Sequence, residues 1–491
     1  MAILAIDAGT TGVTALAVNE LGEVVARGYC EFPQHFPQPG WVEHDPDEIW
    51  AATLTSVSKV LAAVGSNSLS AIGITNQRET VLMWDRSNFS GPRRGIVWQD
   101  RRTSEIVDEI RNLRVEDKVR HKTGLGLDPY FSSSKLLWLS RNEKAVWQGV
   151  LDGTFAVGTV DTYLIARMTQ GRVHVTDASN ASRTQLFNLA SGDWDDELLE
   201  LFNVPRNVLP EVVPSYGVVG TSEADSLLGL SLPIAGIAGD QQAALFGQTA
   251  FDVGDSKCTY GTGSFILYNT GSELKISDHG LLTTVAWKEP SGELTYALEG
   301  AVFVTGSAVQ WLRDGLGIIQ SAVDVEALAQ SVESSDGVVF VPALSGLGAP
   351  YWDPYARGSI QGITRGTTSA HVARATLDAI AFQVRDVVDA MIKDIGKPLQ
   401  QLRVDGGASA NNLLMQLQAN YLHVPVIRGK NLESTGIGAA FLAGLGTGVW
   451  VDKDELRKSI TVDREFSPAP WDESEYVRWH KAVDRSRNWI D

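Results

Sequence analysis

The first thirty residues alternate between apolar runs and short polar turns. Apolar side chains dominate positions 3–6 and 13–18, and a small, glycine-containing turn with one carboxylate separates the two runs. A third strand-like run covers 24–32, after another turn at 19–22. Short apolar runs bounded by turn residues are typical of β-strands. The chain is therefore predicted to open with three consecutive antiparallel strands.

Helical spacing begins soon afterwards. Asp45 and Pro46 are residue types preferred at a helix start, and apolar residues then recur every three or four positions from Trp50 to Val64. A strand pattern follows at 70–75, and helix and strand patterns alternate further along the chain. This order predicts an α/β protein with a mixed sheet covered by helices.

The pattern of the opening turn returns in the second half of the chain. A strand, a Gly-Thr turn and a second strand occupy 257–268, as they do at 3–18. A β-rich stretch follows at 281–298, and apolar residues from Leu377 to Ile395 keep a helical period for about five turns. Two halves of similar design predict an internal repeat and a cleft between two lobes.

Length and composition limit the possible functions. A chain of 491 residues is expected to form two large or three smaller domains. Its net charge of −18 argues against nucleic acid or an anionic membrane as the main partner. The two cysteines, Cys30 and Cys258, fit a reducing compartment. Because the sequence shows neither a secretory signal nor an apolar run long enough for a bilayer, a cytoplasmic location is expected.

Four junctions between a strand and a turn or helix are candidate ligand sites, at 7–11, 240–242, 261–263 and 406–411. Backbone N–H groups and threonine hydroxyls in such turns can bind phosphate, and Asp7 could hold a Mg²⁺ ion that bridges phosphate oxygens. Each junction also has an ordinary alternative, namely a hairpin turn, a glycine turn or a helix cap. The Walker and dinucleotide motifs are absent from the sequence, which argues against a dehydrogenase. Together the junctions favour a two-lobed nucleotide clamp.

Longer segments resemble a known family. Segments 130–141 and 358–378 resemble the two signature motifs of the FGGY family of carbohydrate kinases, in the sugar kinase/Hsp70/actin superfamily. The segments most similar to its glycerol-phosphorylating members are 40–46, 73–80, 236–248 and 348–358. The resemblance implies an α/β fold of two ribonuclease-H-like (actin-like ATPase) domains, at 1–248 and 249–491, with mixed sheets flanked by helices and an active-site cleft between them.

The resemblance also implies an activity, which is the ATP-dependent phosphorylation of glycerol to sn-glycerol 3-phosphate. Asp240 corresponds to the general base, and Asp7 to the carboxylate that binds Mg²⁺, through water. The residues that correspond to the polyol site are Arg78, Glu79, Trp98, Tyr130, Asp240, Gln241 and Phe265. The residues that correspond to the nucleotide site are Thr10, Thr11, Gly12, Thr262, Gly306, Gln310, Gly407 and Asn411.

Alternatives remain at the level of the sequence. Arg78 and Glu79 could be a surface ion pair, and the three aromatic residues could pack in a core. Within the family, the substrate could be another small polyol or ketose, such as erythritol, dihydroxyacetone or xylulose. Outside it, a chaperone-type nucleotide switch would share the fold. Family members often form homodimers or homotetramers, but no segment of the sequence marks an interface.

The sequence departs from the family pattern in two places. Thr14 stands where glycerol-phosphorylating members usually carry arginine, so the phosphate end of the site has one cation fewer. Positions 207–256 contain no Lys, Arg or His. Regulated bacterial members bind fructose 1,6-bisphosphate through a basic loop in this region, and some relatives are activated by phosphorylation of a loop histidine. Both kinds of regulation are expected to be absent.

Overall fold

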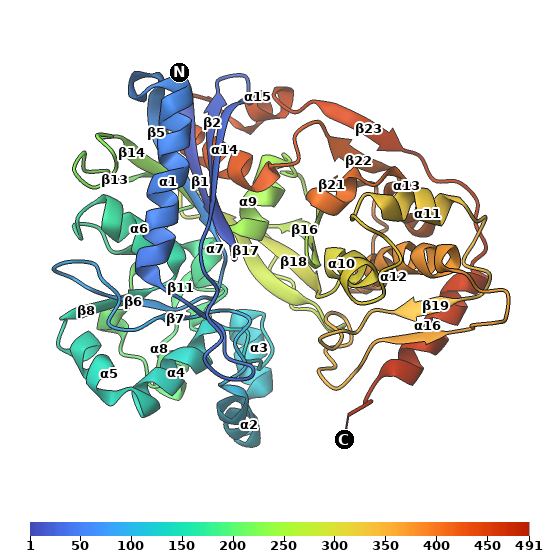
Figure 1. Ribbon diagram of the computed structural model, residues 1–491. Coiled ribbons are helices and arrows are strands. Elements are labelled where there is room, and N and C mark those ends of the chain that lie inside the picture. Colours follow the sequence, from blue (N-terminus) through green and yellow to red (C-terminus); the bar gives the residue numbers. More distant parts are fainter. Residues whose placement is uncertain (491) are drawn as a thin grey trace.

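The computed structural model describes residues 1–490 and contains two large β-sheets, one in each half of the molecule (Figure 1). The first sheet has six strands, and the three N-terminal ones are consecutive and antiparallel, which confirms the prediction. In spatial order its strands are β13 Tyr216–Thr221, β14 Pro233–Gly239, β5 Leu69–Asn76, β1 Ala2–Ala8, β2 Gly12–Asn19 and β3 Val24–Glu31.

The second sheet has seven strands and contains the repeated Gly-Thr hairpin between β15 and β16. In spatial order its strands are β17 Leu282–Lys288, β18 Leu294–Val302, β16 Ser264–Gly271, β15 Ser256–Tyr260, β21 Leu402–Asp405, β22 Val426–Gly429 and β23 Val462–Phe466.

The two sheets share one strand plan. In the first, β3, β2 and β1 are antiparallel neighbours, and β5 and β14 continue parallel to β1. In the second, β18, β16 and β15 are antiparallel neighbours, and β21 and β22 continue parallel to β15. The same order and directions in both sheets confirm the internal repeat and the expected fold of two mixed sheets flanked by helices.

Helices cover both faces of the first sheet. On one face, α1 (Pro46–Val64) and α6 (Val160–Met168) share a core with the alternate residues Leu4 and Ile6. Asp45 caps α1, because its side chain accepts the Asp47 N–H at 2.9 Å. On the other face, Ile3 and Ala5 belong to a second core. Burial on both faces explains the uninterrupted apolar run of β1.

The N-terminal half also contains smaller elements, among which β8, α4, α5 and α8 lie in the lower left of Figure 1. Their bounds are β4 Glu43–His44, β6 Leu82–Asp85, β7 Gly95–Ile96, α2 Ser104–Asn112, α3 Glu116–Thr123, α4 Ser132–Asn142, α5 Lys144–Leu151, β8 Phe155–Gly158, β9 Val175–Asp177, α7 Ala178–Ala181, β10 Phe187–Asn188, β11 Asp193–Trp194, α8 Asp196–Leu201 and β12 Glu211–Val213.

The long helix predicted after Ser369 is confirmed as α12, Ser369–Ile395, and most of its apolar residues lie in the core of the second lobe. No helix within residues 1–490 combines the length and the apolar character that crossing a bilayer requires. The other elements of this half are α10 Gly306–Asp314, α11 Asp324–Gln330, β19 Val339–Val341, β20 Ser359–Gln361, α13 Asn412–Leu422, α15 Lys453–Lys458 and α16 Ser474–Ser486.

One helix of the second half packs on the first sheet. Helix α14 (Ser434–Thr447) lies across β1, β5 and β14 and beside α9 (Asp240–Gly247). Glycines make this approach possible: a Cβ on Gly438 would lie 1.8 Å from the Ala243 carbonyl oxygen, and one on Gly73 would lie 2.1 Å from that of Ala439. The two halves of the chain therefore share a core where the sheets meet.

Candidate active site

Arg78 lies buried where the two halves meet, just after β5. Its Nε is 3.1 Å from Oδ1 of Asp240. Its Nη1 and Nη2 donate to the two carboxylate oxygens of Glu299, on β18, at 2.6 and 2.9 Å. Arg78 is 3% exposed and Glu79 only 1%, so a surface ion pair is excluded.

Asp240 begins α9 directly after β14. The N-cap of this helix is Gly239, so the interpretation of Asp240 as a simple helix cap is wrong. A Cβ on Gly239 would lie 2.7 Å from the Cδ atom of Arg78, so only glycine leaves room for the arginine stem. Asp240 Oδ1 also accepts the backbone N–H of Gln241 at 2.7 Å.

Glu79 is held in an unusual backbone conformation. Its φ of 63° is in the left-handed region, which costs free energy for a residue with a side chain. The Ser132 hydroxyl donates to its carbonyl oxygen at 2.8 Å, and Arg183 Nε donates to its Oε1 at 2.8 Å. Strain of this kind is retained at functional sites, where the surrounding structure fixes it.

Two arginines and three carboxylates share this buried site. Burial by itself would raise the pKa of Glu299, but the charges of Arg183 and Arg78 lower it to about 2. Burial raises the pKa of Asp240, and the Arg78 charge and the Gln241 N–H oppose this rise. Burial also raises the pKa of Glu79, so the site contains one firmly ionised carboxylate, Glu299, and two carboxylates with a raised proton affinity, Glu79 and Asp240.

Aromatic rings stand beside this network. Trp98 and Tyr130 pack edge to face, with ring centroids 5.5 Å apart. Tyr130 is buried, whereas Trp98 and Phe265 are partly exposed, so core packing does not account for all three rings. Within residues 1–490 the Tyr130 hydroxyl has no hydrogen-bond partner, and burial together with the Glu79 charge raises its pKa well above the usual range.

The first hairpin contacts the aromatic ring of Trp98. Trp98 Nε1 donates to the Thr10 hydroxyl at 2.9 Å, and Thr11 is exposed. A Cβ on Gly12 would lie 2.8 Å from the Tyr29 ring, so a larger residue cannot replace this glycine without moving the tyrosine. The backbone closes the turn with a hydrogen bond of 3.0 Å from Gly9 N to Gly12 O.

Asp7 lies at the end of β1, half-buried and without a cationic partner within residues 1–490. Burial and the neighbouring carboxylates of Asp240 and Glu433 raise the pKa of Asp7 to about 8. A carboxylate in this position is stabilised in its ionised form by a cation, so it fits a divalent metal ion. No three His, Cys, Asp or Glu side chains of the described chain are arranged so that they could together hold a metal ion, so protein groups would supply few of the ligands.

The second hairpin brings three segments of the predicted nucleotide site together. Gly306 N donates to Gly261 O at 3.0 Å, and Thr305 N donates to Thr262 O at 2.9 Å. Gln310 is exposed one turn further along α10. Gly406 has φ of 82°, and a Cβ there would lie 2.6 Å from Tyr260 O, so the loop before Gly407 also meets this hairpin.

Asn411 has a structural role in addition to its predicted one. Its side-chain oxygen caps α13, because it accepts the Leu414 N–H at 2.9 Å. Its two side-chain N–H groups donate to no protein group within residues 1–490, so they could bind a ligand.

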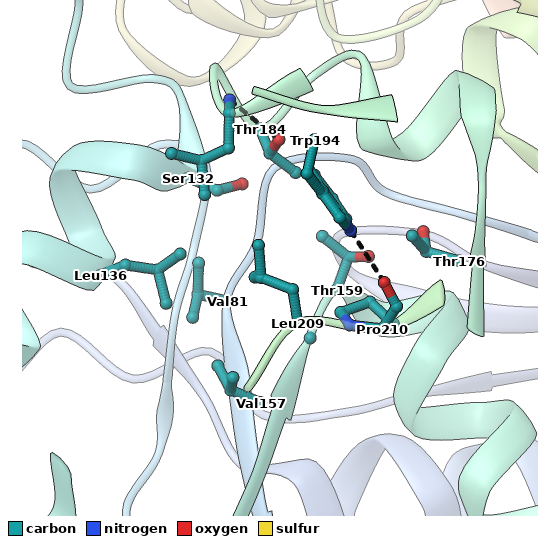
Figure 2. A pocket seen from close by; sticks show the side chains of 12 residues that line it. Val81, Ser132, Leu136, Val157, Thr159, Thr176, Thr184, Trp194, Leu209 and Pro210 are labelled. Carbon is teal, nitrogen blue, oxygen red and sulfur yellow. Dashed lines mark hydrogen bonds between the residues drawn. The ribbon is translucent and has the colours of Figure 1, made fainter. Parts of the chain in front are cut away.

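A small cavity is lined by Val81, two residues after Glu79, and by Ser132 (Figure 2). Its volume is about 20 Å³, roughly the space of one water molecule. Ser132 and Thr184 line it, and apolar side chains such as Val81, Val157 and Leu209 point into it. It contains no charged group, so it is a packing defect and not the candidate site.

The sequence patterns missed three charged residues of the site: Arg183, Glu299 and Lys257. Glu299 had a usable signal, because it is a carboxylate inside an apolar strand and needs a buried cation. Lys257, at the start of β15, had a similar one. Arg183 had none, because its partners Glu79 and Glu299 are about a hundred residues away in either direction along the chain.

Family models match both halves of the chain. The model described as the N-terminal domain of the FGGY family of carbohydrate kinases matches residues 2–247, and the one described as its C-terminal domain matches residues 256–447. The chain belongs to the FGGY family of carbohydrate kinases.

Within the FGGY family, this chain is 51% identical to a glycerol kinase of Bdellovibrio bacteriovorus over 98% of its own length and 99% of that protein. Its fold matches the crystal structure of Plasmodium falciparum glycerol kinase with ADP, with a TM-score of 0.91, 36% identity and coverage of 99% and 98%. It also matches a ligand-bound xylulose kinase from Lactobacillus acidophilus, with a TM-score of 0.87, 26% identity and coverage of 99% and 96%.

Proposed function

We propose that this FGGY kinase transfers the γ-phosphoryl group of ATP to glycerol and forms sn-glycerol 3-phosphate and ADP. The observation that carries the proposal is the 3.1 Å approach of Arg78 Nε to Asp240 Oδ1, beside Trp98 and Tyr130. The closeness of a guanidinium, a candidate base and two aromatic rings supports the proposal. The glycerol kinase that is 51% identical over nearly the full chain supports the choice of substrate.

In the proposed step, Arg78 donates to one substrate oxygen and Glu79 accepts from a hydroxyl, so the polyol is held at a fixed angle. Asp240 takes the proton of the reacting hydroxyl while the oxygen of that hydroxyl forms a bond to the γ-phosphorus. The bond from that phosphorus to the bridging oxygen breaks, and ADP leaves with the electron pair. Positioning and charge neutralisation contribute most of the rate in such transfers.

The two hairpins are proposed to bind the nucleotide. Thr10, Thr11, Gly12 and Thr262 would contact its phosphates, and Gly306, Gln310, Gly407 and Asn411 would lie on the adenosine side. Asp7 would hold Mg²⁺ through water, in agreement with the raised pKa of its carboxyl group. Bound Mg²⁺ would neutralise part of the phosphate charge.

A kinase of another small polyol or ketose is the second candidate, favoured by the likeness to a xylulose kinase. The experiment is a comparison of kcat/KM for glycerol, dihydroxyacetone, erythritol and xylulose with ATP and Mg²⁺. Glycerol is expected to be the best substrate, and a better result for any other polyol would overturn this choice. A nucleotide switch would instead show slow ATP turnover that no polyol stimulates.

The proposal includes a division of the chain at residues 248 and 249, a homodimer or homotetramer, and a cytoplasmic location, which the unpaired cysteines Cys30 and Cys258 support. Because residues 207–256 contain no Lys, Arg or His, fructose 1,6-bisphosphate and phosphorylation of a loop histidine are not expected to regulate turnover. Inhibition at physiological bisphosphate concentrations would refute the first of these expectations.

A further inference from the structure

Lys257 is a completely buried cation beside the proposed polyol site. Its Nζ donates to Gln241 Oε1 at 2.5 Å, to Thr259 Oγ1 at 2.9 Å and to the Phe265 carbonyl oxygen at 3.4 Å. An ammonium group has three protons and no acceptor. All three protons are therefore used, and the position of the nitrogen is fixed. The proposed phosphoryl transfer does not itself require this lysine.

The contact with Lys257 determines which way the Gln241 carboxamide faces. Its oxygen and its nitrogen have nearly the same shape, so the group could bind in either orientation. Because Lys257 can only donate, it accepts the oxygen as partner and rejects the nitrogen. Within residues 1–490 the Gln241 Nε2 donates to no protein group. Gln241 follows Asp240 on α9, so these free N–H groups lie next to the candidate base.

We propose that Lys257 is a positioning residue that fixes Gln241 as a hydrogen-bond donor toward an oxygen of the polyol. The inference rests on the proposed function, because it assigns a role within the same site. The polyol site would then contain two kinds of contact. Gln241 and Arg78 donate hydrogen bonds to substrate oxygens, whereas Glu79 accepts one from a hydroxyl. Lys257 belongs to the second half of the chain and Gln241 to the first, so the orientation depends on the association of the two halves.

Lys257 also acts on Asp240 through its charge. The groups that influence Asp240 are Arg78 at 3.1 Å, Lys257, Glu299 and Asp7. The positive charges of Arg78 and Lys257 lower the pKa of Asp240, while burial and Glu299 raise it. Removal of the Lys257 charge therefore raises this pKa, and the acid limb of the kcat/KM profile moves to higher pH, because the base must be unprotonated.

A double-mutant cycle tests the proposal, using Lys257→Met, Gln241→Met and the pair together. If Lys257 acts through Gln241, each single variant raises the KM for glycerol by about tenfold, the equivalent of one hydrogen bond, and leaves the KM for ATP unchanged. The double variant should also show about a tenfold increase, because the lysine has nothing left to orient. A product of the two effects, about a hundredfold, would overturn the proposal, as would an unchanged KM in Lys257→Met.

A second variant separates the donor from the charge. Lys257→Gln keeps an N–H donor for Gln241 but removes the positive charge. It should keep the KM for glycerol within about threefold of the wild-type value, yet shift the acid limb as Lys257→Met does. A KM raised about tenfold over the wild-type value would contradict the donor role, and this outcome can be measured even if Lys257→Met fails to fold. Lys122→Met is the matched control, because it removes a lysine bound to Asp195 outside the site.

The cycle is measured with the polyol that the wild-type protein phosphorylates best. A preference for another polyol would overturn the assignment of glycerol but leave the coupling between Lys257 and Gln241 measurable. Multiplicative effects together with efficient glycerol phosphorylation would overturn only the role of Lys257.

Discussion

Arg78 and Glu299 come from opposite halves of the chain and form a buried, bidentate ion pair, with N–O distances of 2.6 and 2.9 Å. Planar guanidinium and carboxylate groups match in this geometry, which fixes orientation as well as distance. The remaining nitrogen of Arg78, Nε, then faces Asp240. The alignment of the candidate base with its neighbouring cation thus depends on contact between the two sheets.

Replacing Glu299 with glutamine should destabilise the protein. It leaves Arg78 and Arg183 buried with one carboxylate fewer, and breaking a buried pair typically costs about 3 kcal/mol. Urea unfolding of Glu299→Gln and wild type measures the difference. Asp314→Asn is the control, because its ion pair with Arg313 lies on the surface and should leave the unfolding midpoint unchanged. Equal shifts in both variants would contradict the importance of the buried pair.

Asp240→Asn should lose turnover but retain the polyol. Asparagine keeps the size of the side chain but is not basic, so kcat is expected to fall by about a thousandfold. Glycerol binding should remain near the wild-type value, because Arg78, Glu79 and the aromatic rings are unchanged. Tryptophan fluorescence titration reports binding, and a coupled ADP assay reports turnover. Substantial turnover in the variant would remove Asp240 as the base.

Asp386 should make the stability of the second lobe depend on pH. Burial raises its pKa from 3.8 to about 6, although Tyr476 and Trp479 donate hydrogen bonds to it. Between these values the folded state binds the proton and the unfolded chain does not. The contribution is therefore present below pH 3.8 and is lost as pH rises through 6, by about 3 kcal/mol in total.

The difference in unfolding free energy between wild type and Asp386→Asn isolates this effect, because asparagine does not titrate. The unfolding free energy of wild type minus that of the variant should decrease as the pH is raised from 4 to 7. Tryptophan fluorescence reports the unfolding. Asp389→Asn, on the same helix, leaves Asp386 in place and should keep the wild-type pH dependence. A pH-independent difference for Asp386→Asn would refute the buried titration.

Gly438→Ala should disturb both stability and activity. The new Cβ would lie 1.8 Å from the Ala243 backbone oxygen, so α14 and α9 must move apart. Overpacking of this kind costs about 1–3 kcal/mol, and movement of α9 displaces Asp240. Thermal unfolding and kcat measure the two effects. Gly366→Ala is the control, because its Cβ would meet nothing closer than 3.7 Å. If neither variant changed stability or kcat, the close packing of α14 against α9 would be ruled out as a requirement.

Local patterns predicted the elements better than the site. Residue types that favour turns predicted the hairpins at 7–12 and 261–263, and the spacing of apolar residues predicted the helix α12. Both are short-range properties of the sequence. The network around Arg78 does not, because Glu299 is 221 positions away and their contact depends on how the two sheets associate. The placement of α14 on the first sheet is equally non-local, since its apolar sequence fits a core in either half.

The packing of α14 has a consequence for dissecting the molecule. A truncated polypeptide that ends near residue 248 would lack the cover over Ile3, Ala5 and Ala235 on its central sheet. Such a fragment would expose a bare apolar surface and aggregate, even though it matches a complete family domain. The complementary fragment would contain α14 but not the sheet on which this helix packs. The two fragments of this kinase should therefore recover a native fold only when they are produced together.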